Sequence, residues 1–455
     1  MPIPARLKAL LGGGFVRSVA LLAGGTAFAQ GLMVLALPFL TRLYTPHDFG
    51  ILAVYAGLLA IISGAACLRF DIAIPLPESD EDAINVLAVA LLSGAVVSLG
   101  ITVSVVFFPN LIARWLRQPE LASYLWMLPI GVLAASSYSA LQFWTMREKA
   151  FAAIARTRMS QAIGAITAQA SLGWLGFAPF GLLLGQMISG GAGVVGLAAR
   201  GFSKNRDMVQ LIRPGKMRAM FRDYNRFPKF SALETLANTA GIQVPIILVA
   251  ALSKGHEAGY LMLAMRVMQT PMGLIGGAIS QVYLSEASEE QRAGRLGTFT
   301  TTVLAGLVRT GVGPLLFAGI VAPQVFGVVF GTEWQNAGEL VSWMTPWFIM
   351  QFLASPISMV MHVANKQPQM LILTLFGLIL RVGLVILAYI LEPNYIAEFY
   401  AVSGFVYYTI CLIIFYISSG ATSGDFKFTR LGIIHLGAWI VAALLVVEAM
   451  QGKML

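Results

Sequence analysis

Charged residues and cysteines are scarce in this sequence, and both scarcities narrow the class of protein. Charged residues make up 11% of the 455 residues, whereas hydrophobic residues make up 58%. A soluble domain is roughly 25% charged, so the composition excludes an ordinary water-soluble chain. The two cysteines, Cys67 and Cys411, are too few for a disulfide framework or a cysteine-ligated metal site.

Motifs of enzymatic chemistry are missing as well. The sequence has no P-loop, no histidine cluster with metal-ligand spacing, and no nucleophile with a base at helical spacing. His362 and His435 are isolated, and the glycines at 190–193 lack the strand–turn–helix context of a nucleotide-binding fingerprint. We therefore expect no catalytic residues, no metal, no cofactor and no ATP-driven step in this chain.

Long apolar runs occupy most of the chain instead. A helix that crosses a bilayer needs about 20 predominantly apolar residues, and the run that begins at Val16 is too long for a secretory signal. The sequence predicts an all-α polytopic membrane protein with twelve core transmembrane helices and a thirteenth near the C-terminus. The runs lie at about 16–40, 49–70, 83–108, 122–144, 157–176, 179–199, 230–252, 258–282, 298–322, 338–362, 369–391, 395–418 and 431–450.

Lysine and arginine are distributed unevenly between the loops. With a cytoplasmic N-terminus, 21 of the 30 basic residues fall in cytoplasmic segments, five fall outside and four lie within helices. This asymmetry follows the positive-inside rule, so the net charge of +9 indicates membrane topology rather than nucleic-acid binding. The longest loop, 200–229, holds nine basic residues and is predicted to lie along anionic headgroups. A polybasic partner-binding site is the alternative.

An internal repeat divides the predicted helices into two sets of six. His47-Asp48-Phe49-Gly50-Ile51-Leu52 is echoed by His256-Glu257-Ala258-Gly259-Tyr260-Leu261, and Trp126-Met127-Leu128-Pro129 is echoed by Trp343-Met344-Thr345-Pro346. Two parallel-related bundles place a substrate path between the halves. We predict an N-terminal six-helix bundle at 1–199, a basic cytoplasmic linker at 200–229, a C-terminal six-helix bundle at 230–418, and a tail with an extra helix at 419–455.

Arginines within the apolar runs are the candidate site residues. An ionised group near the bilayer centre costs at least about 2.5 kcal/mol and normally faces a cavity or a partner. Arg266, Arg309 and Arg381 lie deep in their predicted helices, and the guanidinium fork suits phosphate. The predicted cationic cavity also includes Arg69, although snorkelling at the end of the second helix explains its position as well.

Polar neighbours supplement these arginines. Glu234 is the carboxylate most comparable in depth, Gln269 shares a helix face with Arg266, and Asn238 adds an amide to the seventh helix. Hydrogen bonding between helices is an alternative role for such amides. Carbonyls exposed at kinks near Pro271 and Pro314 are likewise an alternative partner for Arg266 and Arg309.

The segment Leu68-Arg69-Phe70-Asp71-Ile72-Ala73-Ile74-Pro75-Leu76-Pro77 resembles a family signature. It is similar to the "R-Y-E-x-A-I-x-L-P" motif of the polysaccharide-repeat (O-antigen type) flippases, which belong to the multidrug/oligosaccharidyl-lipid/polysaccharide exporter superfamily. Thr41-Arg42-Leu43-Tyr44-Thr45-Pro46 and Gln281-Val282-Tyr283-Leu284 also fit that family. Asp71 of the signature joins the supporting polar residues of the candidate site.

The resemblance implies both a fold and a function. The expected fold is a V of two six-helix bundles. The expected function moves a polyprenyl-pyrophosphate-linked oligosaccharide from the cytoplasmic to the periplasmic leaflet of a bacterial inner membrane. Membrane lipids and polysaccharide assembly proteins, such as a polymerase, are the implied partners. The alternatives are a cation-coupled drug exporter of the same fold and a membrane glycosyltransferase or polymerase.

Overall fold

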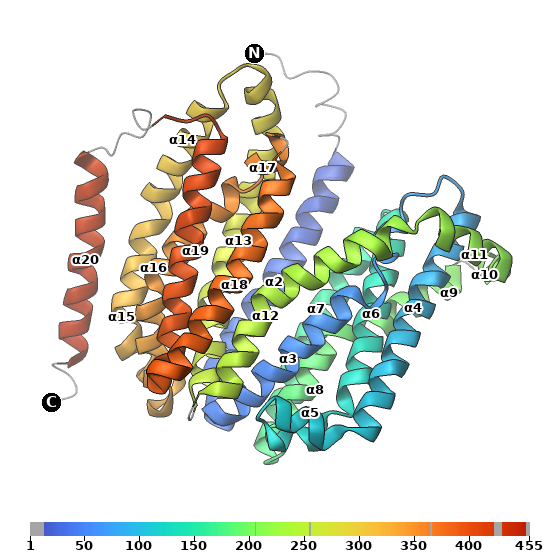
Figure 1. Cartoon of the computed structure of the whole chain (residues 1–455), viewed down its shortest axis with the longest axis horizontal. Coiled ribbons are helices and arrows are strands. Elements are labelled where there is room, and N and C mark those ends of the chain that lie inside the picture. The colour runs from blue at the N-terminus through green and yellow to red at the C-terminus, as the bar shows by residue number, and fades with distance from the viewer. Residues whose placement is uncertain (1–12, 205, 254–255, 365, 423–429, 452–455) are drawn as a thin grey trace. The chain divides into compact units, whose positions relative to one another are not determined.

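Helices account for the regular structure of the chain in the computed structural model, which describes residues 13–204, 206–253, 256–364, 366–422 and 430–451. No strand occurs within these ranges, which confirms the predicted all-α class (Figure 1). Each predicted apolar run overlaps helical segments. The helices up to residue 223 are α2 (Gly13–Leu43), α3 (Pro46–Ala66), α4 (Asp80–Phe107), α5 (Pro109–Trp115), α6 (Met127–Arg147), α7 (Phe151–Trp174), α8 (Phe180–Gly191), α9 (Gly193–Lys204), α10 (Arg206–Val209) and α11 (Pro214–Asp223).

The remaining helices continue the same pattern. Nine spans in the described ranges are long and apolar enough to cross a membrane, so the chain is a multi-pass membrane protein; the total of twelve plus one stays a prediction. The helices after residue 231 are α12 (Ala232–Leu252), α13 (Glu257–Arg292), α14 (Leu296–Leu307), α15 (Gly313–Phe330), α16 (Gln335–Ile357), α17 (Val360–Val363), α18 (Gln367–Leu391), α19 (Ile396–Ser418) and α20 (Arg430–Gln451).

Contacts divide the chain into two compact units. Unit 1 comprises residues 1–44 and 54–243, and unit 2 comprises 45–53 and 244–455. The predicted linker at 200–229 belongs to unit 1 by its contacts, because α11 packs on α4. The predicted boundaries of the two six-helix repeats and of the C-terminal tail stay predictions.

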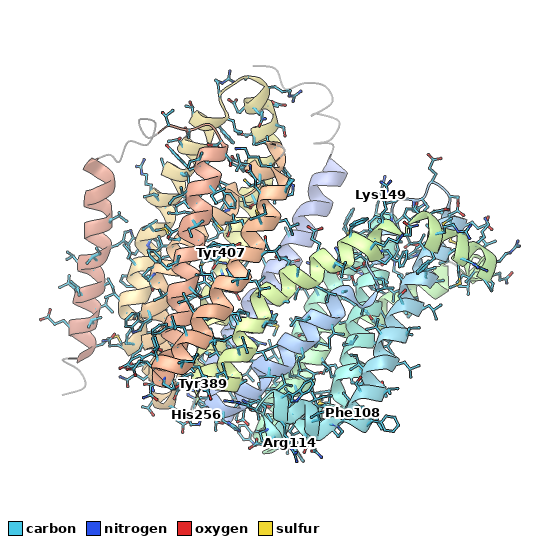
Figure 2. The ribbon with its side chains drawn as sticks, in the orientation of Figure 1. Phe108, Arg114, Lys149, His256, Tyr389 and Tyr407 are labelled. Carbon is cyan, nitrogen blue, oxygen red and sulfur yellow. The ribbon has the colours of Figure 1, made fainter. Side chains whose placement is uncertain are left out.

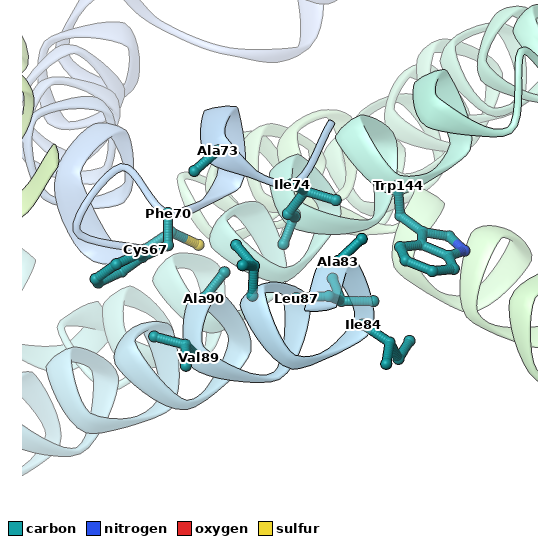
Figure 3. Close-up of a cluster of buried hydrophobic side chains, with 12 residues drawn as sticks. Cys67, Phe70, Ala73, Ile74, Ala83, Ile84, Leu87, Val89, Ala90 and Trp144 are labelled. Atoms are coloured by element: carbon teal, nitrogen blue, oxygen red, sulfur yellow. The ribbon is translucent and has the colours of Figure 1, made fainter. Parts of the chain in front are cut away.

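A cluster of buried side chains from α4, α6 and the signature segment forms part of the core of unit 1 (Figure 3). Phe70, Ala73 and Ile74 are fully buried there against α4, and Trp144 of α6 is 5% exposed. Met217 and Met220 of α11 pack against this cluster from the linker. The signature segment is therefore part of a packed core, and the apolar residues of the linker extend that core.

Glycines allow close packing of the sixth apolar run. The run is broken into α8 and α9 at Ala192. A Cβ on Gly191 would lie 2.5 Å from that of Ala134, and one on Gly193 would lie 2.5 Å from the Tyr138 ring. Gly191 and Gly193 therefore allow this run to pack closely against α6.

The two copies of the first repeated motif meet in unit 2. Thr45 and Asp48 form a reciprocal capping box at the start of α3: the Thr45 amide donates to Asp48 Oδ2 (2.8 Å), and the Asp48 amide donates to Thr45 Oγ1 (3.3 Å). Gly50 approaches Ala258, and a Cβ on Gly259 would clash with the carbonyl oxygen of Pro46. The equivalent glycines of the repeat thus let the two turns pack closely.

A π-helical segment interrupts the ninth apolar run. The segment η4 (Val308–Val312) joins α14 to α15 and is followed by Gly313 and Pro314. Proline lacks the amide that an α-helix needs, and π-bulges are common at functional sites. This irregularity lies within the candidate membrane span Leu296–Phe330 and contains Arg309.

The last helix packs against unit 2. Trp439 of α20 lies edge-to-face against Phe317 of α15, with ring centroids 5.7 Å apart, and it contacts Gly313. The helix α20 spans Arg430–Gln451 and includes the apolar stretch Leu436–Met450. A predicted helix therefore exists at 431–450, and its crossing of the membrane remains a prediction.

Candidate functional site

Arg309 is the most exposed of the predicted deep arginines. It lies in the π-helical segment η4, near the middle of the span Leu296–Phe330, and its side chain is exposed rather than packed in the core of unit 2. Thr310 beside it is exposed too, and its hydroxyl donates to the carbonyl of Gly306 (2.9 Å). Because a guanidinium facing lipid at this depth is costly, the arrangement favours a hydrated surface around Arg309.

Arg266 and Gln269 share one face of α13, as their spacing predicts. Both side chains are partly buried, and the Gln269 amide donates to the Met265 sulfur (3.3 Å). The helix continues through Pro271. The Arg266 carbonyl accepts a hydrogen bond from Thr270 Oγ1 (2.8 Å) one turn later on the same helix.

Arg381 is buried against two tyrosines of α19. Its side chain is 7% exposed, and its Cζ lies 4.3 Å from the centroid of the Tyr407 ring and 5.7 Å from that of Tyr408. Figure 2 shows Tyr407 about midway along α19. A guanidinium over a desolvated aromatic ring contributes about 2 kcal/mol. Arg381 thus has two aromatic partners, which the apolar pattern of α19 did not predict.

Arg69 and Asp71 come together in the signature segment of unit 1. Asp71 is 3% exposed, its Oδ2 accepts a hydrogen bond from Ser139 Oγ (2.6 Å), and Arg69 Nη1 lies 3.9 Å from the same oxygen. Leu68 and Arg69 have φ angles of +49° and +61°, a left-handed conformation that costs non-glycine residues energy. The Asp71 contacts help to hold this tight turn, so both residues have a structural role in unit 1.

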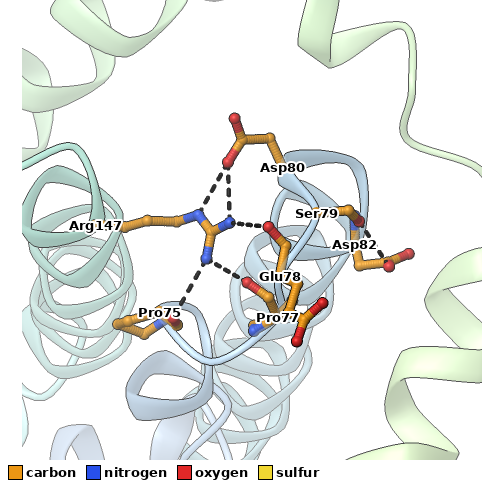
Figure 4. Close-up of polar contacts among 7 residues, drawn as sticks. All are labelled: Pro75, Pro77, Glu78, Ser79, Asp80, Asp82 and Arg147. Atoms are coloured by element: carbon orange, nitrogen blue, oxygen red, sulfur yellow. Dashed lines mark hydrogen bonds and ion pairs between the residues drawn. The ribbon is translucent and has the colours of Figure 1, made fainter.

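Arg147 holds the end of the signature segment and the residues just after it (Figure 4). This last residue of α6 donates to the carbonyls of Pro75 (3.2 Å), Pro77 (2.6 Å) and Glu78 (3.3 Å). It also donates to Asp80 Oδ1 through Nε (3.1 Å) and Nη2 (2.9 Å). The sequence indicates only that Arg147 is one of the basic residues of the predicted cytoplasmic segments. Nothing in its local surroundings distinguishes it from the other arginines there.

Acidic and amide side chains also lie near the N-terminal ends of α4 and α12. Ser79 caps α4, since its Oγ accepts from the Asp82 amide (3.0 Å), so the acidic run at 78–82 is a helix start. Glu234 and Asn238 are one turn apart on α12, and both side chains are exposed. These two polar residues mark one face of α12, which otherwise belongs to an apolar span.

A pocket at one end of unit 2 holds a group of carboxylates that no motif in the sequence predicts. Its volume is about 350 Å³, and its lining includes His256, Glu257, Glu339 and Glu398, from the early turns of α13, α16 and α19. Figure 2 shows His256 at this end of the unit. The group is missed in the sequence because each glutamate by itself looks like an acidic residue placed to complement a helix dipole.

Burial raises the pKa of the Glu257 carboxyl, which lies outside the membrane spans; a Ser253 hydrogen bond opposes this effect and nearby Glu398 adds to it. The folded-state pKa thus exceeds the unfolded value, so stability is lost as pH rises from about 4.5 through the folded pKa. We expect Glu257→Gln to raise the melting temperature by a few degrees at pH 7 and to leave it unchanged below pH 4.5.

Thermal unfolding of purified protein between pH 4 and pH 8 checks this expectation. Glu333→Gln, an exposed carboxylate in unit 2, is the matched control and should show no such difference. An equal shift at both ends of the pH range would contradict the assigned cause.

The predicted site residues therefore fall into two sets. Unit 1 holds the contacting pair Arg69 and Asp71, and also Glu234 and Asn238. Unit 2 holds the remaining four, which are Arg266, Gln269, Arg309 and Arg381. Arg266 and Gln269 share a helix face, Arg309 occupies the π-helical segment and Arg381 packs on α19. One cavity that uses all of them remains a prediction.

Comparison with solved structures identifies the fold. The chain is similar to the lipid II flippase MurJ in an inward closed conformation, with a TM-score of 0.68 and 14% identity over 95% of this chain and 99% of that one. It is also similar to an inward-facing MATE multidrug transporter of the MOP superfamily (TM-score 0.59, 17% identity, 88% and 94% covered). A MOP superfamily transporter from Pyrococcus furiosus is a third neighbour (0.54, 15%, 90% and 96%).

The helical fold, its membrane spans and its arginines within spans define a membrane protein with the fold of the MOP superfamily transporters. The chain belongs to the polysaccharide biosynthesis protein family, whose model matches residues 39–339. That range contains the signature segment, Arg266 and Arg309. No curated protein matches the sequence.

Proposed function

We propose that this protein is a flippase for a polyprenyl-pyrophosphate-linked oligosaccharide, which it moves from the cytoplasmic to the periplasmic leaflet of a bacterial inner membrane. Arg309 is the observation that carries the proposal. An exposed arginine near the middle of a membrane span favours a hydrated surface that can accept an anion. Membership of the polysaccharide biosynthesis family supports a sugar-containing substrate, and the neighbour named a lipid II flippase supports a lipid-linked one.

The proposed mechanism is alternating access. The anionic headgroup leaves the membrane surface for a cationic cavity, where Arg309 and Arg266 neutralise the pyrophosphate and the apolar tail stays in the bilayer. The guanidinium forks suit phosphate oxygens because they donate paired hydrogen bonds. Arg381 supplies a further positive charge in unit 2, buried against Tyr407 and Tyr408. We place the N-terminus in the cytoplasm on the basis of the basic-loop asymmetry.

A cation-coupled drug exporter is the second candidate, favoured by the MATE neighbours and by the carboxylates in the pocket of unit 2. Arginines inside the spans disfavour cationic substrates. The Pyrococcus furiosus neighbour is itself described as a superfamily member whose binding pocket has reverse polarity, which suggests a different function for that protein.

Reconstituted translocation tests the proposal. Purified protein is reconstituted into liposomes that contain a lipid-linked oligosaccharide. It should increase the fraction of the sugar that an impermeant lectin or periodate, added on the opposite side of the liposome membrane, can reach. Empty liposomes and liposomes with an unrelated membrane protein are the controls. Protein-dependent transport of cationic dyes, without movement of the lipid-linked sugar, would instead support the drug exporter.

A further inference from the structure

An apolar groove of about 630 Å³ lies within unit 1, outside the candidate substrate site. Three helices supply most of its walls, with Leu87 and Leu91 on α4, Leu141 and Trp144 on α6, and Val194 and Ala198 on α9. Figure 1 labels these helices at the right of the view, as it does α10 and α11. Such an apolar groove suits a hydrocarbon ligand better than a sugar.

The linker completes the groove and is fixed in place. Ile212 and Met217 contribute to the lining. Fully buried Asn85 of α4 donates to the Leu211 carbonyl (3.1 Å), and its Oδ1 accepts from the Arg213 amide (3.0 Å). Phe221 of α11 packs on Phe70 with ring centroids 5.3 Å apart. The wall that the linker provides is therefore held by both polar and apolar contacts.

Positive charge flanks the linker residues that line the groove. Arg213 follows Ile212 directly and Arg218 follows Met217 directly, and both side chains are exposed. Lys216 between them pairs with Glu81 (2.8 Å) and Asp82 (3.6 Å). Lys216 balances one of these two negative charges, and the hydrogen bond to Glu81 raises its pKa. Arg213 is the N-cap residue of α11, where backbone amides favour an anion, and Arg218 lies in the second turn of the same helix.

We propose that this groove binds one acyl chain of an anionic phospholipid of the cytoplasmic leaflet, with the lipid phosphate on Arg213 and Arg218. The basic rim selects an anionic headgroup, since juxtamembrane arginines attract the acidic lipids of that leaflet. The inference uses the proposed orientation of the chain and is independent of the proposed substrate.

Photolabelling of the full-length protein in liposomes tests the proposal. A phosphatidylglycerol probe with a diazirine in its acyl chain should label peptides of α4, α6 and α9 more than a matched phosphatidylcholine probe does. Ala95→Trp, which fills the groove from α4, should remove most of this labelling. The matched control is Val96→Trp on the same helix, because Val96 is 61% exposed and does not line the groove.

Charge variants test the contact with the lipid phosphate independently of the groove-filling variant. The double variant Arg213→Gln/Arg218→Gln should lower labelling by about fivefold per arginine removed. Arg226→Gln/Lys229→Gln changes the net charge equally at exposed residues and should leave labelling unchanged. These variants alter exposed side chains only, so they remain informative if Ala95→Trp does not fold.

Three results would overturn the proposal. Equal labelling by both probes, or equal labelling in Ala95→Trp and Val96→Trp, would mean ordinary contact with surrounding lipid. Displacement of the probe by a polyprenyl phosphate, but not by unlabelled phosphatidylglycerol, would assign the groove to the carrier lipid instead. Labelling requires no translocation, so failure of this proposal is distinguishable from failure of the proposed flippase activity.

Discussion

Replacing Arg309 by alanine is expected to lower translocation of a lipid-linked oligosaccharide by about 10- to 100-fold, the loss that follows removal of a hydrogen bond to a charged group. Arg309 is exposed within a membrane span, so it is available to an anion without repacking the core of unit 2. Arg309→Lys keeps the charge and loses the planar fork. We therefore expect it to retain part of the activity.

The measurement is the rate of sugar translocation in liposomes, normalised to the amount of inserted protein. Thr310→Ala is the matched control, because Thr310 is exposed in the same π-helical segment and its hydroxyl donates to the local Gly306 carbonyl. Thr310→Ala should translocate at the wild-type rate. Wild-type translocation by Arg309→Ala would refute the role assigned to this arginine.

Replacing Arg147 by alanine is expected to destabilise unit 1 by about 2 kcal/mol, mainly because three backbone carbonyls lose a charged donor; the ion pair with Asp80, whose side chain is 60% exposed, adds little. Its side chain is 15% exposed and donates the hydrogen bonds that join the end of α6 to the loop at 75–80. Without it, three carbonyls and the Asp80 carboxylate lose a donor. Arg147→Lys restores charge but not the fork, so it should recover only part of the loss.

Chemical or thermal unfolding in detergent measures this effect. Arg156→Ala, an exposed arginine on α7 of the same unit, is the control and should change stability little. Asp80→Asn should be milder than Arg147→Ala, because the carbonyl contacts remain. Loss of translocation with unchanged stability would contradict the structural role and would place Arg147 in the transport pathway.

The membrane class of this protein was predictable because its cause is local. Each span needs a run of apolar residues long enough for the bilayer, and each run can be read without its neighbours. The six-helix repeat stays a prediction, but the turn at Gly259 has a local cause too, because a Cβ there would clash with the Pro46 carbonyl where the two copies of the motif meet. The acidic residue of each turn starts a helix, as at Asp48, where it completes a capping box.

The candidate site was predictable only in part. The sequence marks Arg309 as a charge in an apolar run, but the exposure of its side chain depends on how α14 and α15 pack in unit 2. Arg381 is the stronger candidate in sequence, because no proline lies near it, yet the rings of Tyr407 and Tyr408 cover it. Its partners come from another helix, 26 and 27 residues away along the chain, so helical spacing within α18 carries no information about them.

The sequence by itself determined the class of this protein, the location of its helices and the candidate arginines, because hydrophobic length and buried charge act residue by residue. Only the tertiary structure decided which polar groups meet. Arg147 donates to the carbonyl of Pro77 at the end of the signature segment. The glutamates at three helix starts share one pocket, and α11 closes a groove against α4. Each of these arrangements joins residues from separate helices, and their contacts depend on packing that a single sequence does not encode position by position.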